Sequence, residues 1–206
     1  MICIYALFKI FGYFQVRIVN LRLPKGKIVF CSPADGDYDI YIRYIDGSGQ
    51  KKLTNNSATL KNSAIDSDPS FSSDGRNIIF VSGRQGQDTE FMYDYQGRII
   101  GTQSSRYGTS DIYIMEPDGS NQVPLTMQEL NFDPFFSHDS KNIIFTASRN
   151  KKFLSEIMNI SGDNRKLLDI NPGHCIFSPD SHKILDTFQC DLSMMNIDGF
   201  NRARLT

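Results

Sequence analysis

The stretch DPSFSSDGRNIIF, from Asp68 to Phe80, returns further along the chain as DPFFSHDSKNIIF, from Asp133 to Phe145. Nine of the thirteen positions are identical, where average residue frequencies would give about one. A second stretch repeats as well: DIYIRYIDGSGQKKLT, from Asp39 to Thr54, and DIYIMEPDGSNQVPLT, from Asp111 to Thr126, share ten of sixteen positions. Internal repetition of this kind predicts an architecture of similar units that stack on one another.

A third, more divergent copy sets the length of the repeating unit. Phe177 stands 41 residues after Phe136, whereas Phe136 stands 65 residues after Phe71, so one unit carries 24 additional residues. Residues 25–206 therefore hold about four units. We expect them at about 25–54, 66–126, 131–168 and 171–206, with an insertion at 83–109 in the second unit.

Each unit is predicted to form four short strands. The first ends at a phenylalanine, Phe71 in the second unit, and leads into a Ser-x-Asp-Gly or Ser-x-Asp-Ser turn, where the Asp can bond its own backbone. Ile78–Ser82 and Asp111–Met115 are largely apolar runs, which indicates second and third strands covered on both faces. Asp-Gly pairs at 46, 118 and 198 predict hairpins into a fourth strand, whose Lys, Arg and Pro residues suit a solvent-exposed edge.

A four-stranded meander of about 40 residues with two apolar faces is typical of a propeller blade, because neighbouring blades cover both faces. The sequence therefore predicts an all-β fold, a β-propeller of about four blades of four antiparallel strands. Helical repeats do not fit turn residues at this spacing. A β-sandwich is the alternative, since it also uses short strands, but a sandwich does not require the repetition.

The pattern D-P-x-F-S-x-D-G-x-x-I-x-F-x-S-x-R at Asp68–Arg84, followed by D-I-Y-I-M-x-x-D-G-S-N and L-T, resembles the repeat of TolB-type β-propellers, which are related to WD-repeat proteins. The resemblance covers residues 26–206 apart from the insertion. Members of that family usually have Trp where this chain has Phe71, Phe136 and Phe177. They usually close with six or seven blades, so four blades imply part of a longer propeller, which we favour, an open arc, or two copies that complete each other.

The fourth unit departs furthest from the family pattern. His174 and Cys175 replace the Asp-Pro pair of the earlier units, and Asp186 stands where a core Phe is expected. We therefore expect this blade to be less well packed. If the arc is open, its end blades should expose apolar surface, and the isolated chain should self-associate.

The resemblance implies a non-catalytic scaffold that binds a protein or a small ligand through loops on one face. It also favours a periplasmic or other extracytoplasmic location. The separate N-terminal domain that accompanies the propeller of TolB itself has no counterpart in this sequence, so TolB's own partners are not carried over. The alternative is an accessory propeller domain of a hydrolase, peptidase or lyase.

Composition narrows the choice of partner. The chain has 22 Lys and Arg against 23 Asp and Glu, with a net charge of −1, which argues against nucleic-acid binding. Residues 1–24 form an apolar N-terminal segment whose first fourteen residues are too few to span a membrane. They have Lys9 inside the apolar run and no A-x-A cleavage site, so a leading strand is favoured and a processed export signal is the alternative. We expect the rest of the segment to be a leading strand. Four Cys and three His show no zinc-ligand spacing, so no metal or cofactor is predicted.

Catalytic patterns are weak. The nucleophile elbow G-x-S-x-G does not occur. Asp68 and Asp133 could form a carboxylate pair around a central channel, although a structural role at the start of the first strand fits better. Asp35, Asp37 and Asp39 alternate as in a calcium loop, but the Gly that such a loop requires at its sixth position is Ile40. Local ion pairs are expected for Arg84 and Arg149.

The insertion is the segment most particular to this chain. It contains Phe91, Tyr93, Tyr95 and Tyr107, and residues 91–100 predict a hairpin that turns at Gln96-Gly97. Aromatic side chains on a loop held by a rigid scaffold are a common recognition surface. Together with Asp68 and Asp133, they are the predicted binding residues. The alternative is an extra hairpin that packs on its own blade.

Overall fold

The structure of the chain is a computed structural model. It describes residues 16–17, 26–34, 38–55, 65–84, 89–93, 99–104, 109–127, 129–149, 152–168, 170, 175–188 and 191–206. These residues contain strands and turns but no helix.

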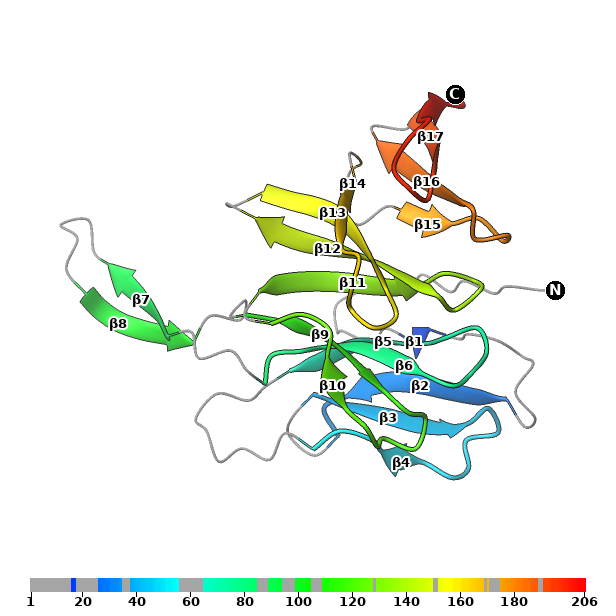
Figure 1. The fold of residues 1–206 in the computed structure, drawn as a ribbon. Helices are drawn as coiled ribbons and strands as arrows, with labels where there is room; N and C mark the ends of the chain where they lie inside the picture. The colour runs from blue at the N-terminus through cyan, green and yellow to red at the C-terminus, as the bar shows by residue number, and fades with distance from the viewer. Residues whose placement is uncertain are drawn as a thin grey trace.

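Four sheets of four antiparallel strands follow one another along the chain and stack one above the next, which confirms the predicted all-β open propeller with four blades (Figure 1). Blade 1 consists of β1 (Val16–Arg17), β2 (Lys27–Ser32), β3 (Asp39–Tyr44) and β4 (Lys51–Lys52). Blade 2 consists of β5 (Asp66–Phe71), β6 (Ile78–Ser82), β9 (Asp111–Met115) and β10 (Val123–Pro124). Blade 3 consists of β11 (Leu130–Phe136), β12 (Asn142–Arg149), β13 (Lys152–Asn159) and β14 (Lys166–Leu168). Blade 4 consists of β15 (Cys175–Phe177), β16 (Lys183–Phe188), β17 (Asp191–Asn196) and β18 (Ala203–Arg204).

Within each blade the strands pair in chain order, as a meander requires. In blade 2, β6 pairs directly with β9, and the chain between them forms a separate two-stranded sheet, β7 (Thr89–Tyr93) with β8 (Ile99–Ser104). This hairpin projects away from the blades in Figure 1. The expected hairpin in the insertion is therefore present. The predicted leading strand is represented by β1, which pairs with β2.

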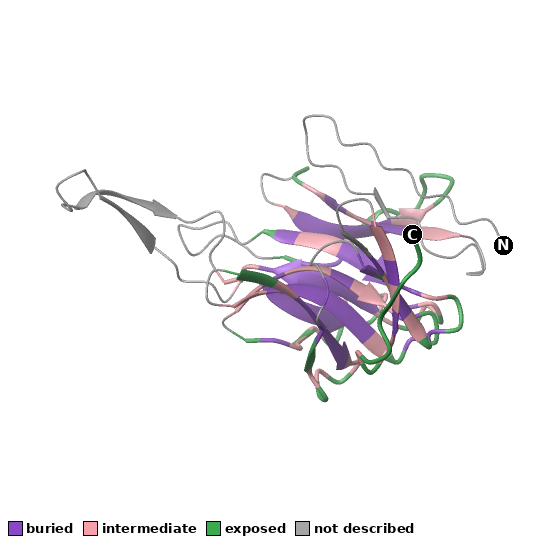
Figure 2. Cartoon of the chain, turned by 90° about the horizontal axis from the view of Figure 1, so that it is seen from above, coloured by how far each residue is buried: buried purple, intermediate pink, exposed green. Residues whose placement is uncertain are grey.

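The core lies between the blades, where side chains of two adjacent sheets meet. Because side chains alternate across a strand, each blade has a forward face, which packs on the next blade, and a rear face, which packs on the previous one. The cluster between blades 1 and 2 joins Val29, Ile42 and Leu53 of the forward face to Phe71 and Met115 of the rear face. Equivalent clusters join blade 2 to blade 3 and blade 3 to blade 4. Buried residues accordingly run along the middle of the sheets in Figure 2, whereas the turns are exposed.

Hydrogen bonds between turns repeat along with the apolar clusters. The backbone N–H of Asp74 donates to Ser140 Oγ of the next blade at 3.2 Å, and the N–H of Asp139 donates to Ser181 Oγ at 2.9 Å. Ser140 and Ser181 have φ values of 61° and 63°, in the left-handed region that costs an ordinary residue about 1–2 kcal/mol. Each serine therefore combines an unfavourable backbone conformation with a hydroxyl that links two blades.

The fourth blade differs from its expected packing at Asp186. This carboxylate is buried, and Arg202 binds it with an Nη2–Oδ2 distance of 2.7 Å. A buried charge is tolerated when it is paired and hydrogen-bonded. The acid that replaces the aromatic residue is thus accommodated by an ion pair. The blade as a whole is less completely buried, as expected, since β17 alternates between buried and half-buried residues where the equivalent β9 is buried throughout. Within the described part of the chain, no helix is long and apolar enough to cross a membrane.

Two glycines of the strand 3 to strand 4 hairpins allow the blade contact to be measured. Gly47 and Gly119 have φ values of 86° and 88°, so alanine meets a similar backbone penalty at both. A Cβ at Gly119 would lie 3.0 Å from the carbonyl oxygen of Leu53 in the previous blade, whereas a Cβ at Gly47 would meet no atom of the described residues within 4 Å. We expect Gly119→Ala to lower the free energy of unfolding by about 1–3 kcal/mol more than Gly47→Ala. Urea denaturation of both variants measures the difference, and equal losses would contradict the packing.

Candidate functional site

The two ends of the strands are chemically different surfaces. One end, which we call the insertion end, carries the β7–β8 hairpin, the β12–β13 connection and the links between blades. The other end carries the Ser-x-Asp turns and the strand 3 to strand 4 hairpins. At that second end, a cavity of about 400 Å³ between blades 1 and 2 is lined by basic Lys27 and Lys51 and acidic Glu116 and Asp118. Because both basic and acidic side chains line it, this cavity has mixed charge. Lys51 Nζ donates to the carbonyl oxygen of Asp118 at 2.6 Å.

Large apolar side chains are exposed at the insertion end. Ile65 precedes β5, Met127 follows β10 and Phe153 lies near the start of β13, with exposed fractions of 38%, 65% and 55%. The ring of Phe153 lies 6.0 Å from that of Phe132. Exposed apolar residues occur singly on most proteins, whereas a contiguous apolar patch marks an interaction surface; the opposite end also exposes Ile45 and Phe200.

A four-charge cluster lies behind these side chains, between blades 2 and 3. Arg149 Nη2 lies 2.8 Å from Glu129 Oε2 and 3.2 Å from Glu156 Oε1. Arg165 binds the same two carboxylates, with a distance of 2.7 Å to Glu129 Oε2, and its guanidinium carbon lies 5.0 Å from the centre of the Phe145 ring. The cluster joins the connection after β10, the end of β12, β13 and the residue before β14. It therefore holds several loops of the insertion end in fixed positions.

Burial raises the pKa of the Glu156 carboxyl above its ordinary value, although Arg149 opposes the rise and Glu129 adds to it. The physical cause is the cost of taking a carboxylate out of water. An acidic side chain at this position reduces the stability of the folded state at neutral pH unless its cations are present.

Arg84 occupies the corresponding place in blade 2. Its guanidinium lies 3.1 Å from Asp66 Oδ2 and donates to Gln122 Oε1 at 2.7 Å. It also stacks over the Tyr113 ring at 4.6 Å. The predicted local ion pairs of Arg84 and Arg149 are therefore present, and both combine charge with aromatic or multivalent contacts.

Asp68 and Asp133 do not lie at the starts of their strands. Each is inside the first strand of its blade, in a β-bulge, with φ values of 52° and 49°. The Asp-Pro pair indicated an irregular position in the strand. It did not indicate a left-handed backbone at the Asp, because the residue before a proline normally adopts an extended conformation. Asp68 and Asp133 are thus two equivalent residues with positive φ on adjacent first strands, β5 and β11. Their binding role stays a prediction.

The insertion aromatics are placed only in part. Phe91 and Tyr93 lie in β7, where Phe91 pairs with Thr102 and Tyr93 with Ile99 of β8. Tyr95 and Tyr107 lie outside the described residues, as do Asp35 and Asp37 of the rejected calcium loop. Among the described residues, no three His, Cys, Asp or Glu side chains form a group that could hold a metal. Sequence reasoning missed Ile65, Met127 and Phe153, whose only signal is an apolar residue beside a polar connection.

No protein-family model matches the chain, and no curated protein matches it. Solved structures do match. The structure of putative TolB from Agrobacterium tumefaciens has a TM-score of 0.60 and 18% identity, over 88% of this chain and 61% of that chain. TolB from Acinetobacter baumannii has a TM-score of 0.59 and 20% identity, over 87% of this chain and 40% of that chain. Puromycin hydrolase has a TM-score of 0.65 and 14% identity, over 93% of this chain and 30% of that chain.

Repetition, sheet topology and these similarities define the class: the chain is an open β-propeller. Its fold is of the TolB type, as the repeated motif predicts. At these identities the likeness concerns the fold. The chain spans from 30% to 61% of the length of these three solved structures.

The charge cluster generates a prediction about pH. Arg149→Met removes one of the two cations beside Glu156, so the pKa of Glu156 should rise further. A carboxyl pKa raised by folding leaves stability intact below the unfolded value, near about 4.3, and lowers it as pH rises through the folded value. We therefore expect a loss of about 1 kcal/mol at pH 7 and a much smaller loss at pH 4, measured by chemical denaturation. Arg149→Lys, which keeps the charge, should lose less, and equal losses at both pH values would contradict this account.

Proposed function

We propose that the chain is a non-catalytic propeller scaffold that binds a protein partner through the insertion end, outside the cytoplasm. The observation that carries the proposal is the exposure of Ile65, Met127 and Phe153 at the same end of the blades as the β7–β8 hairpin. Met and aromatic residues are enriched in protein interfaces. The extracytoplasmic location rests on the resemblance of the repeated motif to TolB-type propellers.

The scaffold supplies the rigidity that such a surface needs. The strands beneath the insertion end, such as β6 and β9, are buried throughout, and the four-charge cluster ties the connections together. A rigid platform reduces the entropy lost when loops bind a partner. The exposed side chains are spread over blades 2 and 3, which suits the broad, shallow contact of a protein better than the concave pocket of a small ligand.

A second candidate function is an accessory propeller domain of a hydrolase or peptidase. The likeness to puromycin hydrolase over 93% of this chain favours it. The DNA on both sides of this reading frame distinguishes the two proposals. An adjoining frame that encodes a G-x-S-x-G domain would replace the scaffold proposal with the accessory domain.

Aromatic side chains of the insertion should contribute to partner capture. Replacing Tyr93 and Tyr95 with alanine should weaken binding of the captured partner about tenfold or more, because truncated aromatic anchors commonly cost more than about 1.4 kcal/mol. Surface plasmon resonance with the immobilised chain measures the affinity, and circular dichroism checks that the variant is folded. Unchanged affinity would remove the insertion from the site.

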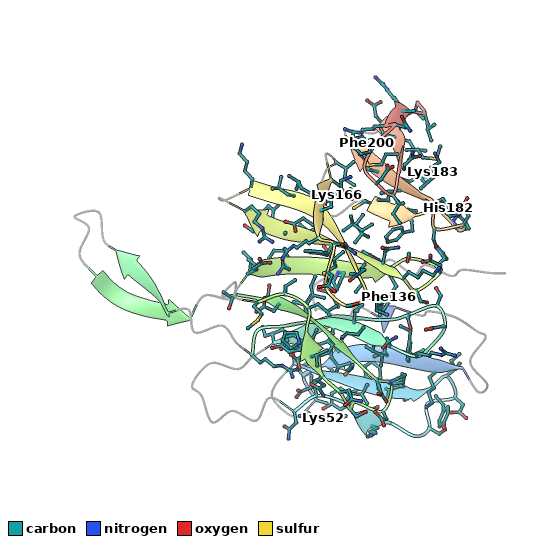
Figure 3. All side chains as sticks on the ribbon, in the orientation of Figure 1. Lys52, Phe136, Lys166, His182, Lys183 and Phe200 are labelled. Atoms are coloured by element: carbon teal, nitrogen blue, oxygen red, sulfur yellow. The ribbon has the colours of Figure 1, made fainter. Side chains whose placement is uncertain are left out.

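A matched pair of phenylalanines tests which end binds. Phe153 lies at the insertion end and Phe200 at the opposite end, and both are exposed, by 55% and 65%. Figure 3 labels Phe200 beside Lys166, far from the insertion hairpin. Phe153→Ala should weaken capture of the same partner, whereas Phe200→Ala should leave it unchanged. The reverse result would move the binding surface to the other end of the blades.

A further inference from the structure

The forward face of blade 4 has no fifth blade among the described residues to cover it. Strand pairing places Ile176, Leu185, Met194 and Ala203 in one row across the sheet. Since side chains alternate, Leu192 and Leu205 lie on the same side. We call these six residues the open face. Ile176 and Leu205 are 50% and 49% exposed, and Leu185, Leu192 and Met194 are half-buried.

The open face continues the series of forward faces that blades 1 to 3 bury. Its row corresponds to Phe135, Ile144 and Ile157 of blade 3, of which Ile144 is fully buried against blade 4. Leu205 corresponds to Leu168, which is 2% exposed beside Gly199 of blade 4. The same side-chain type at the same position is therefore covered in one blade and exposed in the last.

The turn contact also continues. The N–H groups of Asp74 and Asp139 each donate to a serine hydroxyl of the following blade. Asp180 is the equivalent residue of blade 4, and its turn has the same internal bonds, with Ser178 Oγ donating to Asp180 Oδ1 at 2.5 Å and the His182 N–H donating to the same oxygen at 3.0 Å. Blade 4 thus presents both the apolar row and the turn that the internal interfaces use.

The rear face of blade 1, at the other end of the series, has different chemistry. Where blades 2 to 4 have buried Met115, Met158 and Met195, blade 1 has Arg43. The guanidinium carbon of Arg43 lies 5.2 Å from the centre of the Phe30 ring, and Lys52 binds Asp39 at 2.6 Å on the same side of the sheet. On this side of the sheet Ile28, Asp39 and Tyr41 are 8%, 1% and 6% exposed, so the rear face of blade 1 is not an open apolar surface.

We propose that the open face of blade 4 docks a further blade-type β-sheet from outside residues 1–206. The internal interfaces define what its rear face must offer: a Phe, Ile and Met row like Phe177, Ile184 and Met195, a hairpin glycine for Leu205, and a turn serine or glycine for Asp180. Blade 1 of a second copy does not meet this description, because Arg43 stands in place of the methionine and the neighbouring Ile28 and Tyr41 are already buried within one chain. The inference concerns a surface distinct from the insertion end and is independent of the proposed function.

The test supplies such a sheet. A second copy of residues 170–206 is joined after Thr206, with Ile176→Lys and Leu205→Lys in the appended copy so that its own forward face is polar. The appended copy should resist limited proteolysis and unfold with the rest in one transition. Light scattering should show less self-association than in the chain of 206 residues, where the open face is exposed.

Substitutions in the original copy of blade 4 show whether the appended sheet lies on the open face. Ile176→Asp with Leu205→Asp should make cleavage of the appended copy at least about tenfold faster. Both positions are half exposed, so the variant should fold, which circular dichroism of the unextended chain verifies. Val123→Asp is the matched control, since Val123 is 49% exposed on blade 2 and outside the open face. It should leave cleavage unchanged.

Two results would overturn the proposal. If the appended copy is cleaved as fast in the extended chain without Ile176→Asp and Leu205→Asp as in the chain that carries them, the open face does not accept a blade. Undiminished self-association of the extended chain would assign the open face to a second copy of the protein instead.

Discussion

Every blade of this protein depends on its neighbours, because a four-stranded sheet with two apolar faces cannot bury both by itself. Each described core cluster is built from the forward face of one blade and the rear face of the next. Full burial of one Ile or Phe side chain stabilises the fold by about 1.5–3 kcal/mol, and side chains such as Ile78, Ile143 and Ile184 are fully buried only through this pairing. Stability is therefore a sum over interfaces, and the chemistry of the end faces matters as much as that of the interior.

Repetition explains how much of the fold could be predicted from the sequence. The bounds of β6 follow from an apolar run that recurs in the second and third units, and those of β9 from a run that recurs in the first and second; their continuous burial follows from blade stacking. The bulges at Asp68 and Asp133 could not be predicted, since their left-handed backbone is imposed by pairing with the second strand. The exposure of Phe153 and Met127 could not be predicted either, because it depends on which connections meet at one end of the blades.

One position of the second strand, two residues after Ile78, Ile143 or Ile184, shows how the repeat tolerates divergence. In blade 2 it is Phe80, with Arg84 stacked over it at 5.3 Å, and in blade 3 it is Phe145, with Arg165 at 5.0 Å. In blade 4 it is Asp186, which binds Arg202. Arginine can stack on an aromatic ring or pair with a carboxylate. A guanidinium at this place in the interface therefore allows the aromatic residue to be replaced by an acid. From the sequence alone, this replacement would be taken as a loss of packing.

The same reasoning separates stability from recognition in this molecule. Blade packing uses the faces of the strands, whereas the exposed apolar side chains at the insertion end lie on connections or at the start of β13, where no neighbouring blade covers them among the described residues. Connections on a rigid scaffold can change without altering the core. The insertion lengthens one of them while β6 and β9 still pair directly, so a new surface was added to blade 2 without disturbing either of its interfaces. A scaffold of this design acquires specificity at the strand ends and keeps its stability in the strand faces.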